Sequence, residues 1–363
     1  MHPKNQRNKM QDINYDNIER FNSLISKADK ISIVTHMKPD GDAMGSSVAM
    51  YHFLKMLGKN DITVVLPDPY PAFLDFVTAG TPSGSIVAHS DDKAEAEMSI
   101  SESDLIICLD FNAFHRTDTL AEALENSKAD KVLVDHHIGP DRERFTVSFS
   151  ETEISSASEL LYHILMAFPQ IGGNASKLPP ECAKALMTGM TTDTNNFANS
   201  VYPSTLVMAS SLLAAGVDRD SILSELYNRH SESRLRLMGY MMKDLMKITD
   251  DGVAYIVLDR QTLRDYNVQE GDTEGFVNMP LSIGKVRMSL LLKEEDNRIR
   301  VSIRSKKGTS ANRCARMFFN GGGHENAAGG RLNKPADVAT INEVPEYIEK
   351  HTHIYLTEYE DNI

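Results

Sequence analysis

Short apolar runs alternate with longer amphipathic segments in the first half of the chain. Four such runs are rich in β-branched and aliphatic residues and lie at 31–34, 61–66, 104–110 and 131–135. The segment 43–58 between the first two has apolar residues at helical spacing and ends on a glycine. Strands that alternate with helices are typical of a parallel sheet. The pattern predicts an α/β domain in which helices flank a parallel sheet, with a fifth strand at 145–149.

The pattern changes in the second half. From 156 to about 247, apolar residues recur every three to four positions, which predicts a series of helices. Period-two alternation then returns at 253–258, 286–292 and 298–304, followed by a predicted helix at 309–319 and a glycine-rich loop at 321–330. We therefore predict three parts: a first domain at 15–220, a linker helix at 221–250, and a smaller mixed α/β domain at 251–350.

The sequence favours a cytoplasmic protein. No apolar run approaches the ~20 residues that a membrane helix needs, and the polar start lacks the apolar stretch of a secretory signal. The three cysteines are odd in number and far apart, which argues against a disulfide framework and fits a reducing compartment. The apolar helices of 156–247 leave a homodimer open as an alternative to a monomer.

Charge is distributed unevenly along the chain. The net charge of −13 argues against a protein that coats long nucleic acids. Between Pro280 and Arg331, however, eleven basic residues face only four acidic ones. This local excess suits a short anionic ligand.

Residue types that bind metals follow three of the four predicted strands. They are His36, Asp40 and Asp42 after the first, Asp110 at the end of the third, and Asp135, His136 and His137 at the end of the fourth. Because the carboxyl ends of parallel strands meet at one edge of a sheet, we expect these side chains to lie together. Imidazole and carboxylate groups bind divalent metals. Each group taken alone is also explained by a turn, a helix cap or a surface cluster, and Asp193 after a helical segment would be unremarkable by itself.

Six stretches carry a family resemblance. HMKPDGDAMGSS (36–47), LDFN (109–112), VDHH (134–137) and TTDT (191–194), in this order, resemble the four motifs of the DHH phosphoesterase superfamily. SIRS (302–305) and GGGHENAAGG (321–330) resemble the arginine and glycine-rich histidine motifs of the C-terminal substrate-binding domain associated with it. The size and layout are most similar to the NrnA group, bifunctional oligoribonucleases (nanoRNases) that also dephosphorylate adenosine 3′,5′-bisphosphate (pAp). RecJ-type exonucleases share the motifs but usually carry added DNA-binding modules.

This resemblance implies a site for two divalent metal ions, usually manganese, which the mixed nitrogen and oxygen ligands suit. Six residues would be the ligands: His36, Asp40, Asp42, Asp110, His136 and Asp193. The first two would hold one ion, Asp110 would bridge, and the other three would hold the second ion. His137 would lie near the substrate phosphate, and Asp135 would orient the neighbouring imidazoles. Asp110, Asp135, His136 and His137 are thus the expected catalytic residues.

The basic segment of the second domain would bind the substrate. The planar guanidinium of Arg304 suits a phosphate, and Gly322 and Gly323 allow backbone N–H groups to approach one closely beside His324. Taken without the resemblance, a solvated cationic strand and a flexible turn explain these residues equally well. Phe111 follows Asp110 within the second motif, where relatives often have a small polar residue, and we expect it to pack in the core rather than stack on a base.

These inferences together predict a manganese-dependent phosphoesterase acting in the cleft between its domains. It would degrade short single-stranded RNA (nanoRNA) to mononucleotides and remove the 3′-phosphate of pAp to give AMP, with pApA or cyclic di-AMP as further nucleotide substrates. Two alternatives remain open: an inorganic pyrophosphatase or exopolyphosphatase with the same ligands, and a nucleotide-binding module without catalysis. No membrane partner is expected.

Overall fold

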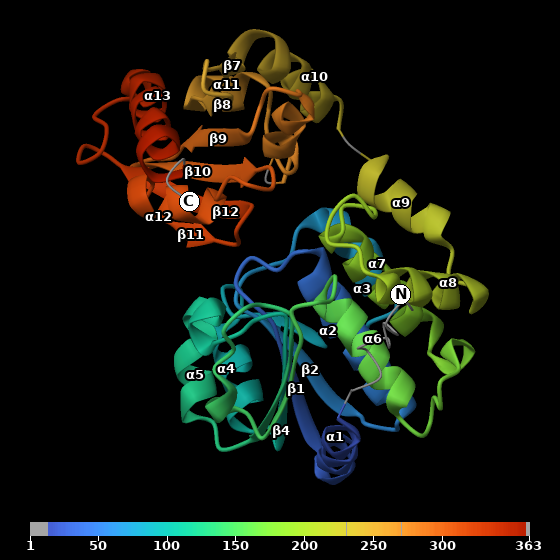
Figure 1. Cartoon of the computed structure of the whole chain (residues 1–363). Helices are drawn as coiled ribbons and strands as arrows, with labels where there is room; N and C mark the ends of the chain where they lie inside the picture. Colours follow the sequence, from blue (N-terminus) through green and yellow to red (C-terminus); the bar gives the residue numbers. More distant parts are fainter. Residues whose placement is uncertain (1–13, 230, 270, 361–363) are drawn as a thin grey trace, which may run out of the picture. The chain divides into compact units, whose positions relative to one another are not determined.

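A computed structural model describes residues 14–229, 231–269 and 271–360. These residues form two compact units, one ending at Arg229 and the other following it (Figure 1). The division falls within the segment predicted as a linker. Among the helices of the described residues, none has the length and apolar character needed to cross a membrane.

The first unit is built on a six-stranded parallel sheet, which confirms the predicted α/β class. Its strands are β1 (Lys30–Val34), β2 (Asp61–Leu66), β3 (Ile86–Ala88), β4 (Leu105–Leu109), β5 (Asp130–Asp135) and β6 (Val147–Ser150). They lie in the order β3-β2-β1-β4-β5-β6, and every neighbouring pair is parallel. The pattern did not predict β3, because three half-buried residues are too few to show a period.

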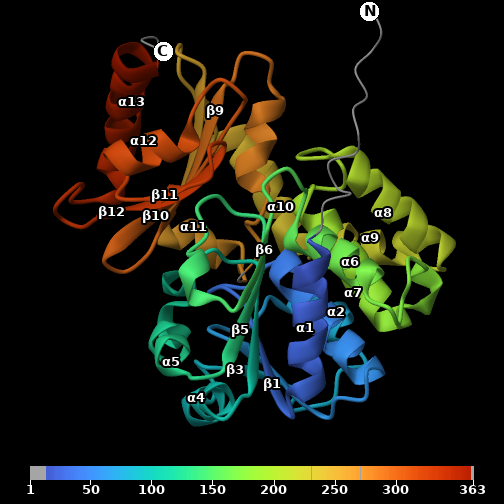
Figure 2. The same cartoon turned by 60° about the horizontal axis from the view of Figure 1, so that its bottom comes forward.

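Helices cover both faces of this sheet (Figure 2). One face carries α1 (Tyr15–Lys27), α2 (Gly41–Met56), α6 (Ala157–Ala167) and α7 (Pro180–Asp193), and the other carries α4 (Lys93–Ser101) and α5 (Ala121–Asn126). The short α3 (Asp75–Thr78), α8 (Pro203–Ala214) and α9 (Arg219–Tyr227) complete the unit. Because both faces are buried, the central strands are mainly apolar, and β4 is apolar throughout, so their apolar runs are visible in the sequence.

The strand order fixes where a site can form. From β1 the chain proceeds to β2 and β3 on one side, and later returns to place β4 on the other side of β1. The loops that leave β1 and β4 therefore diverge and leave a crevice at the carboxyl ends of these two strands. His36 and Asp110 follow these two strands.

The second unit contains a mixed six-stranded sheet. Its strands are β7 (Lys247–Ile248), β8 (Val253–Leu258), β9 (Met288–Glu294), β10 (Arg298–Ser305), β11 (Gly322–Gly323) and β12 (Ala327–Asn333), in the order β11-β12-β10-β9-β8-β7. Only β8 and β9 run parallel. One face packs on α12 (Ala311–Phe318) and α13 (Val344–Ile354). The other packs on α10 (Glu232–Tyr240) and η7 (Phe276–Ser282), and α11 (Arg260–Asp265) follows β8.

Two predicted elements differ in the structure. The segment 221–250 is not one linker helix, because α9 ends at Asn228 in a non-helical conformation and α10 starts anew where the Ser231 side chain accepts a hydrogen bond from the Arg234 backbone N–H. The glycine-rich segment 321–330 is largely strand rather than loop. A Cβ at Gly321 or Gly330 would lie 1.9 or 2.2 Å from a carbonyl oxygen, so glycine allows a backbone approach that a side chain would prevent.

Candidate metal centre

His36, Asp40 and Asp42 lie where β1 passes into α2. The Asp40 side chain accepts hydrogen bonds from the backbone N–H groups of Asp42 and Ala43 and so caps the helix. His36 Nδ1 lies 2.8 Å from the carbonyl oxygen of Met37, which leaves Nε2 directed at the carboxylates. His36 Nε2 lies 3.8 Å from Asp40 Oδ1. Asp40 therefore caps α2 and is at the same time a candidate metal ligand.

Asp110 stands at the centre of the cluster. It directly follows β4 and has a φ of +65°, a left-handed conformation that few residues other than glycine adopt, with aspartate among the more tolerant. Its Oδ2 lies 3.4 Å from His36 Nε2, and its Oδ1 lies 3.4 Å from His136 Nε2. Asp110 therefore contacts the imidazoles that follow two different strands, as a bridging ligand would.

The remaining predicted ligands gather on the other side of Asp110. His136 follows β5, and its Nε2 lies 3.4 Å from Oδ2 of Asp193, the last residue of α7. Three groups in the described residues have ligand atoms within 4.8 Å of one another and could hold a metal ion: His36, Asp40 and Asp110; Asp42, His136 and Asp193; and Asp110, His136 and His137. The structure thus brings all six predicted ligands together.

Asp135 and His137 form a pair next to the cluster. Asp135 is fully buried, and its Oδ1 lies 2.8 Å from His137 Nδ1 while its Oδ2 accepts a hydrogen bond from the His137 backbone N–H. This pairing fixes the orientation of the His137 ring. Asp135 was expected to orient both neighbouring imidazoles, and in the structure its carboxylate pairs with His137.

The start of α6 holds Asp42, a contact that no local pattern in the sequence predicts. The backbone N–H groups of Ala157 and Ser158 donate to Asp42 Oδ2 and Oδ1 at 2.6 and 2.9 Å. A helix N-terminus stabilises a negative charge, so these bonds fix the carboxylate and favour its ionised form. The local signal was present in Ser156 and Glu159, whose spacing is that of a helix capping box, but nothing in it pointed to Asp42.

Glu159 in turn supports the start of α6. Its side chain is fully buried and accepts hydrogen bonds from the backbone N–H and the hydroxyl of Ser155, and from Thr205 Oγ1 at 2.7 Å. These bonds tie the turn before α6 to α8. The position of Asp42 therefore depends on a network that spans three helices.

The pKa values of the cluster are shifted because its ionisable side chains are buried and lie close together. Burial, followed by the charge of Asp110, raises the pKa of Asp42 to about 7. Burial alone would lower the pKa of His136, but Asp110 more than offsets this and raises it to about 10. Burial opposes ionisation of Asp110 as well, and its contacts with His136 and His36 hold its pKa well below the usual value. Acidic groups at such short range resist ionising together unless positive charge lies among them.

The side chains fit a divalent cation. Asp110 Oδ1 is buried and makes no hydrogen bond within the described residues. The separations of 3.4–3.8 Å between neighbouring ligand atoms exceed a hydrogen bond and match atoms that share one ion at ~2.0–2.2 Å. His36 Nε2 and His136 Nε2 both face carboxylates, the arrangement of a mixed nitrogen and oxygen site.

The close contact of α2 and α7 makes a prediction testable at Gly189. A Cβ there would lie 2.0 Å from Ser158 Oγ and 2.8 Å from Asp42 Oδ1. We expect Gly189→Ala to destabilise the fold by about 1–3 kcal/mol and to weaken metal binding, because the helices must separate and Asp42 must move. Thermal unfolding followed by circular dichroism, and calorimetric titration with a divalent metal, measure the two effects.

Gly239→Ala is the matched control for this prediction. Gly239 lies inside α10, and an added Cβ would meet nothing within 4 Å. Alanine is the better helix former, so this variant should be as stable as the parent or more stable. Equal unfolding midpoints for Gly189→Ala and the parent protein would contradict the packing argument.

In the second unit, Arg304 and the glycine-rich segment come to one end of the sheet. Arg304 in β10 pairs with Ala327 in β12, and the backbone N–H of His324 donates to the Ala327 carbonyl at 2.7 Å. Gly322 and Gly323 form β11 beside β12. The Arg304 guanidinium donates to the carbonyl oxygen of its neighbour Ile303, and among the described residues no carboxylate pairs with it. A half-buried arginine without an acidic partner suits an anionic ligand.

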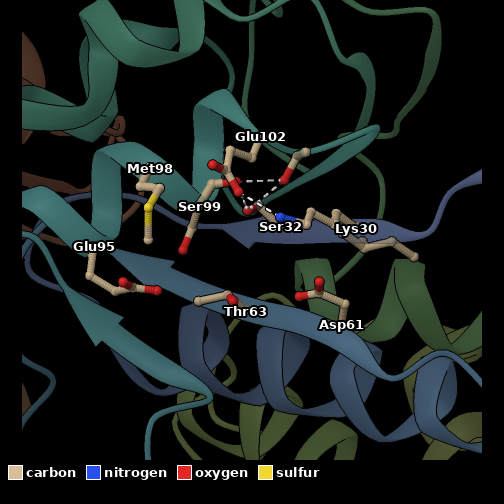
Figure 3. Close-up of a pocket in the computed structure, with 10 residues that line it drawn as sticks. Lys30, Ser32, Asp61, Thr63, Glu95, Met98, Ser99 and Glu102 are labelled. Carbon is tan, nitrogen blue, oxygen red and sulfur yellow. Dashed lines mark hydrogen bonds and ion pairs between the residues drawn. The ribbon is translucent and has the colours of Figure 1, made fainter.

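A small pocket lies away from these residues. Its volume is about 110 Å³, and it opens near the start of β1 and β2, where Lys30 pairs with Glu102 (Figure 3). Asp61 and Glu95 also line it. The metal-binding residues follow the opposite, carboxyl ends of the strands, so this pocket is no part of the centre. Phe111 is fully buried in the core, as expected.

Comparisons with known proteins identify the family. Residues 30–190 match the model of the DHH family N-terminal domain, and residues 250–350 match that of the DHHA1 domain. A Streptococcus mutans protein named "Probable bifunctional oligoribonuclease and PAP phosphatase NrnA" is 29% identical over 85% of this chain and 92% of its own. The Bacillus subtilis bifunctional oligoribonuclease and PAP phosphatase NrnA is 27% identical over 85% and 91%.

A solved structure agrees with these matches. The crystal structure of an exopolyphosphatase-related protein from Bacteroides fragilis is 38% identical, covers 94% of this chain and 96% of its own, and superposes with a TM-score of 0.86. Both family models match the units in which the structure places the metal-binding groups and Arg304. The chain therefore belongs to the DHH family of phosphoesterases and carries a C-terminal DHHA1 domain.

Proposed function

We propose that this protein hydrolyses short RNA oligonucleotides to mononucleotides and the 3′-phosphate of pAp to give AMP, with pApA or cyclic di-AMP as further substrates. The proposal rests mainly on Asp110, which belongs to two of the candidate metal-binding groups and lies 3.4 Å from both His36 and His136. Two divalent cations bound there would acidify a water molecule and neutralise charge on the phosphoryl group. The names of the Streptococcus and Bacillus relatives support the substrate class.

Each side chain has a proposed role at this centre. His36 and Asp40 bind one cation, Asp42, His136 and Asp193 bind the other, and Asp110 binds both. His137, oriented by Asp135, donates to the substrate phosphate. Manganese is the proposed metal because imidazole and carboxylate ligands suit it.

The DHHA1 domain holds the rest of the substrate in this proposal. Arg304 binds a phosphate through its planar guanidinium, beside the backbone of Gly322 and Gly323 and the ring of His324. Short RNA is favoured over long RNA because the basic segment is local, and the rest of the chain carries an excess of negative charge that repels a long polyanion. We also propose that the protein acts in the cytoplasm.

A second candidate is an exopolyphosphatase or pyrophosphatase, which is supported by the similarity to the exopolyphosphatase-related protein from Bacteroides fragilis. Such an enzyme would use the same metal ligands without recognising a nucleoside. The test is to incubate the purified protein and manganese, with and without a chelator, with end-labelled RNA from a dinucleotide to long oligomers, pAp, pApA, pyrophosphate and polyphosphate.

We expect chelator-sensitive degradation of the shortest RNAs and release of phosphate from pAp. Rapid hydrolysis of pyrophosphate or polyphosphate beside inert nucleotides would overturn the proposed substrate and retain the metal centre. Tight nucleotide binding without any turnover would identify a binding module instead.

A further inference from the structure

Two arginines lie opposite each other on the face of the DHHA1 sheet that elsewhere packs on α10 and η7. Arg300 in β10 and Arg331 in β12 are partners in the antiparallel register, so their side chains leave the same face. Their neighbours Ile299, Val301 and Leu332 are buried in the core under α12 and α13. Both arginines therefore point to the opposite face, where both are exposed.

Their positive charges are not compensated within the described residues. The nearby hairpin after β9 carries three acidic residues, but each pairs with another cation: Glu294 with Lys334, Glu295 with Arg298, and Asp296 with Arg260. No ion pair joins Arg300 or Arg331 to any carboxylate in residues 231–269 or 271–360. Like charges directly opposite each other destabilise a sheet, and an anion bound between them would remove that cost.

The same face connects this pair to Arg304. Ser302 and its partner Gly329 lie between the Arg300–Arg331 pair and Arg304. A Cβ at Gly329 would meet only the Val301 carbonyl oxygen, at 3.6 Å, so no bulky side chain stands in the middle of this path. The four residue steps from Arg300 to Arg304 span ~14 Å at ~3.4 Å each.

This length matches a short stretch of RNA. The path of ~14 Å is longer than the separation of two neighbouring phosphates on one strand, so a ligand that spans it must be an oligonucleotide longer than a dinucleotide. η7 packs against β9 and β10 on this face, and Arg331 in β12 remains exposed. The ligand that fits is thus a single-stranded oligonucleotide with one phosphate at each end of the path.

We propose that Arg300 and Arg331 form a second phosphate site that binds oligonucleotides a few residues away from the phosphate at Arg304. The inference rests on the proposed function and deepens it by assigning a determinant of RNA length. Both phosphates of pAp are on one nucleoside, so pAp is too short to reach this site. The arginine pair therefore favours RNA longer than a dinucleotide over a dinucleotide or pAp.

The test compares Arg300→Gln/Arg331→Gln with a matched control, Arg264→Gln/Lys350→Gln. The control removes two charges from exposed positions on α11 and α13 of the same domain. Binding of a fluorescein-labelled pentaribonucleotide is measured by anisotropy in a chelator, so that the result does not depend on turnover. The values of kcat/KM for the pentaribonucleotide, a diribonucleotide and pAp are then measured with manganese.

We expect the arginine variant to bind the pentaribonucleotide about tenfold more weakly, with a salt dependence reduced by about 0.7 in log–log slope for one lost phosphate contact. Its kcat/KM for pAp should be unchanged, and the control should match the parent protein. Equal losses for pAp and the pentaribonucleotide, equal losses in the control, or unchanged pentaribonucleotide binding would each overturn the inference. The single variants Arg300→Gln and Arg331→Gln should each show a smaller effect of the same kind.

This experiment separates the inference from the proposed function. Absence of hydrolysis of pAp and RNA by the parent protein would contradict the proposed function, whatever the variants show. Normal hydrolysis by the parent protein with no dependence on Arg300 and Arg331 would contradict only the second phosphate site.

Discussion

Replacing Asp110 with asparagine is expected to reduce hydrolysis of every substrate by about 10³-fold or more, because Asp110 is proposed to bind both cations and each cation would provide several kcal/mol of transition-state stabilisation. Asparagine keeps the shape of the side chain and tolerates the left-handed backbone at this position. The variant should therefore fold. An alanine there would add backbone strain to the loss of the ligand.

The measurement combines steady-state kinetics with direct counting of bound manganese by electron paramagnetic resonance. The variant should bind less manganese than the parent protein and show an unchanged circular dichroism spectrum. Asp91→Asn, at an exposed position outside the cluster, is the matched control and should behave as the parent protein does. Near-normal activity and manganese content in Asp110→Asn would refute the assignment of Asp110 as a bridging ligand.

Replacing Arg304 with alanine should have the second-largest effect. A charge-assisted hydrogen bond to phosphate contributes roughly 1.5–3 kcal/mol, so kcat/KM for pAp and short RNA should fall about 10- to 100-fold. A generic aryl phosphate has no further phosphate for Arg304 to bind, and its hydrolysis should hardly change. Arg304→Lys keeps the charge but loses the planar fork and should recover activity only in part.

Arg298→Ala is the control for this prediction. Arg298 lies on the same strand and face as Arg304, but it already pairs with Glu295. Arg298→Ala should therefore leave the hydrolysis of the nucleotides and of the aryl phosphate unchanged. If Arg304→Ala slowed the aryl phosphate and the nucleotides equally, Arg304 would act on the metal centre or on stability rather than on the nucleotide.

Much of the architecture could be predicted because it depends on local patterns. A parallel strand buried on both faces is mainly apolar along its length, so β1, β2, β4 and β5 are visible as short apolar runs. Potential ligands directly after such runs must lie at the carboxyl edge of the sheet. His36, Asp110 and His136 were predicted to lie close together on this ground, and in the structure they do.

Other features of the site could not be predicted, because they depend on contacts between distant segments. The hydrogen bond from the Ala157 backbone to Asp42 joins residues 115 positions apart, and it forms only when α6 docks beside α2. The left-handed backbone of Asp110 has no local sequence signal either. The glycine-rich segment was mistaken for a loop, because glycine disfavours strands except where another backbone must approach closely.

Hydrophobic period and residue type are local properties, so the class of the fold, the edge of the sheet where the candidate ligands gather and the family resemblance can all be read from the chain. Three features arise only on folding: the carboxylate between the two imidazoles, the helix end that holds Asp42, and the pairing of Arg300 with Arg331. These facts follow from strand register and helix docking, which are set by packing of the whole core. A shift of one residue in β12 would turn Arg331 to the other face and separate the pair.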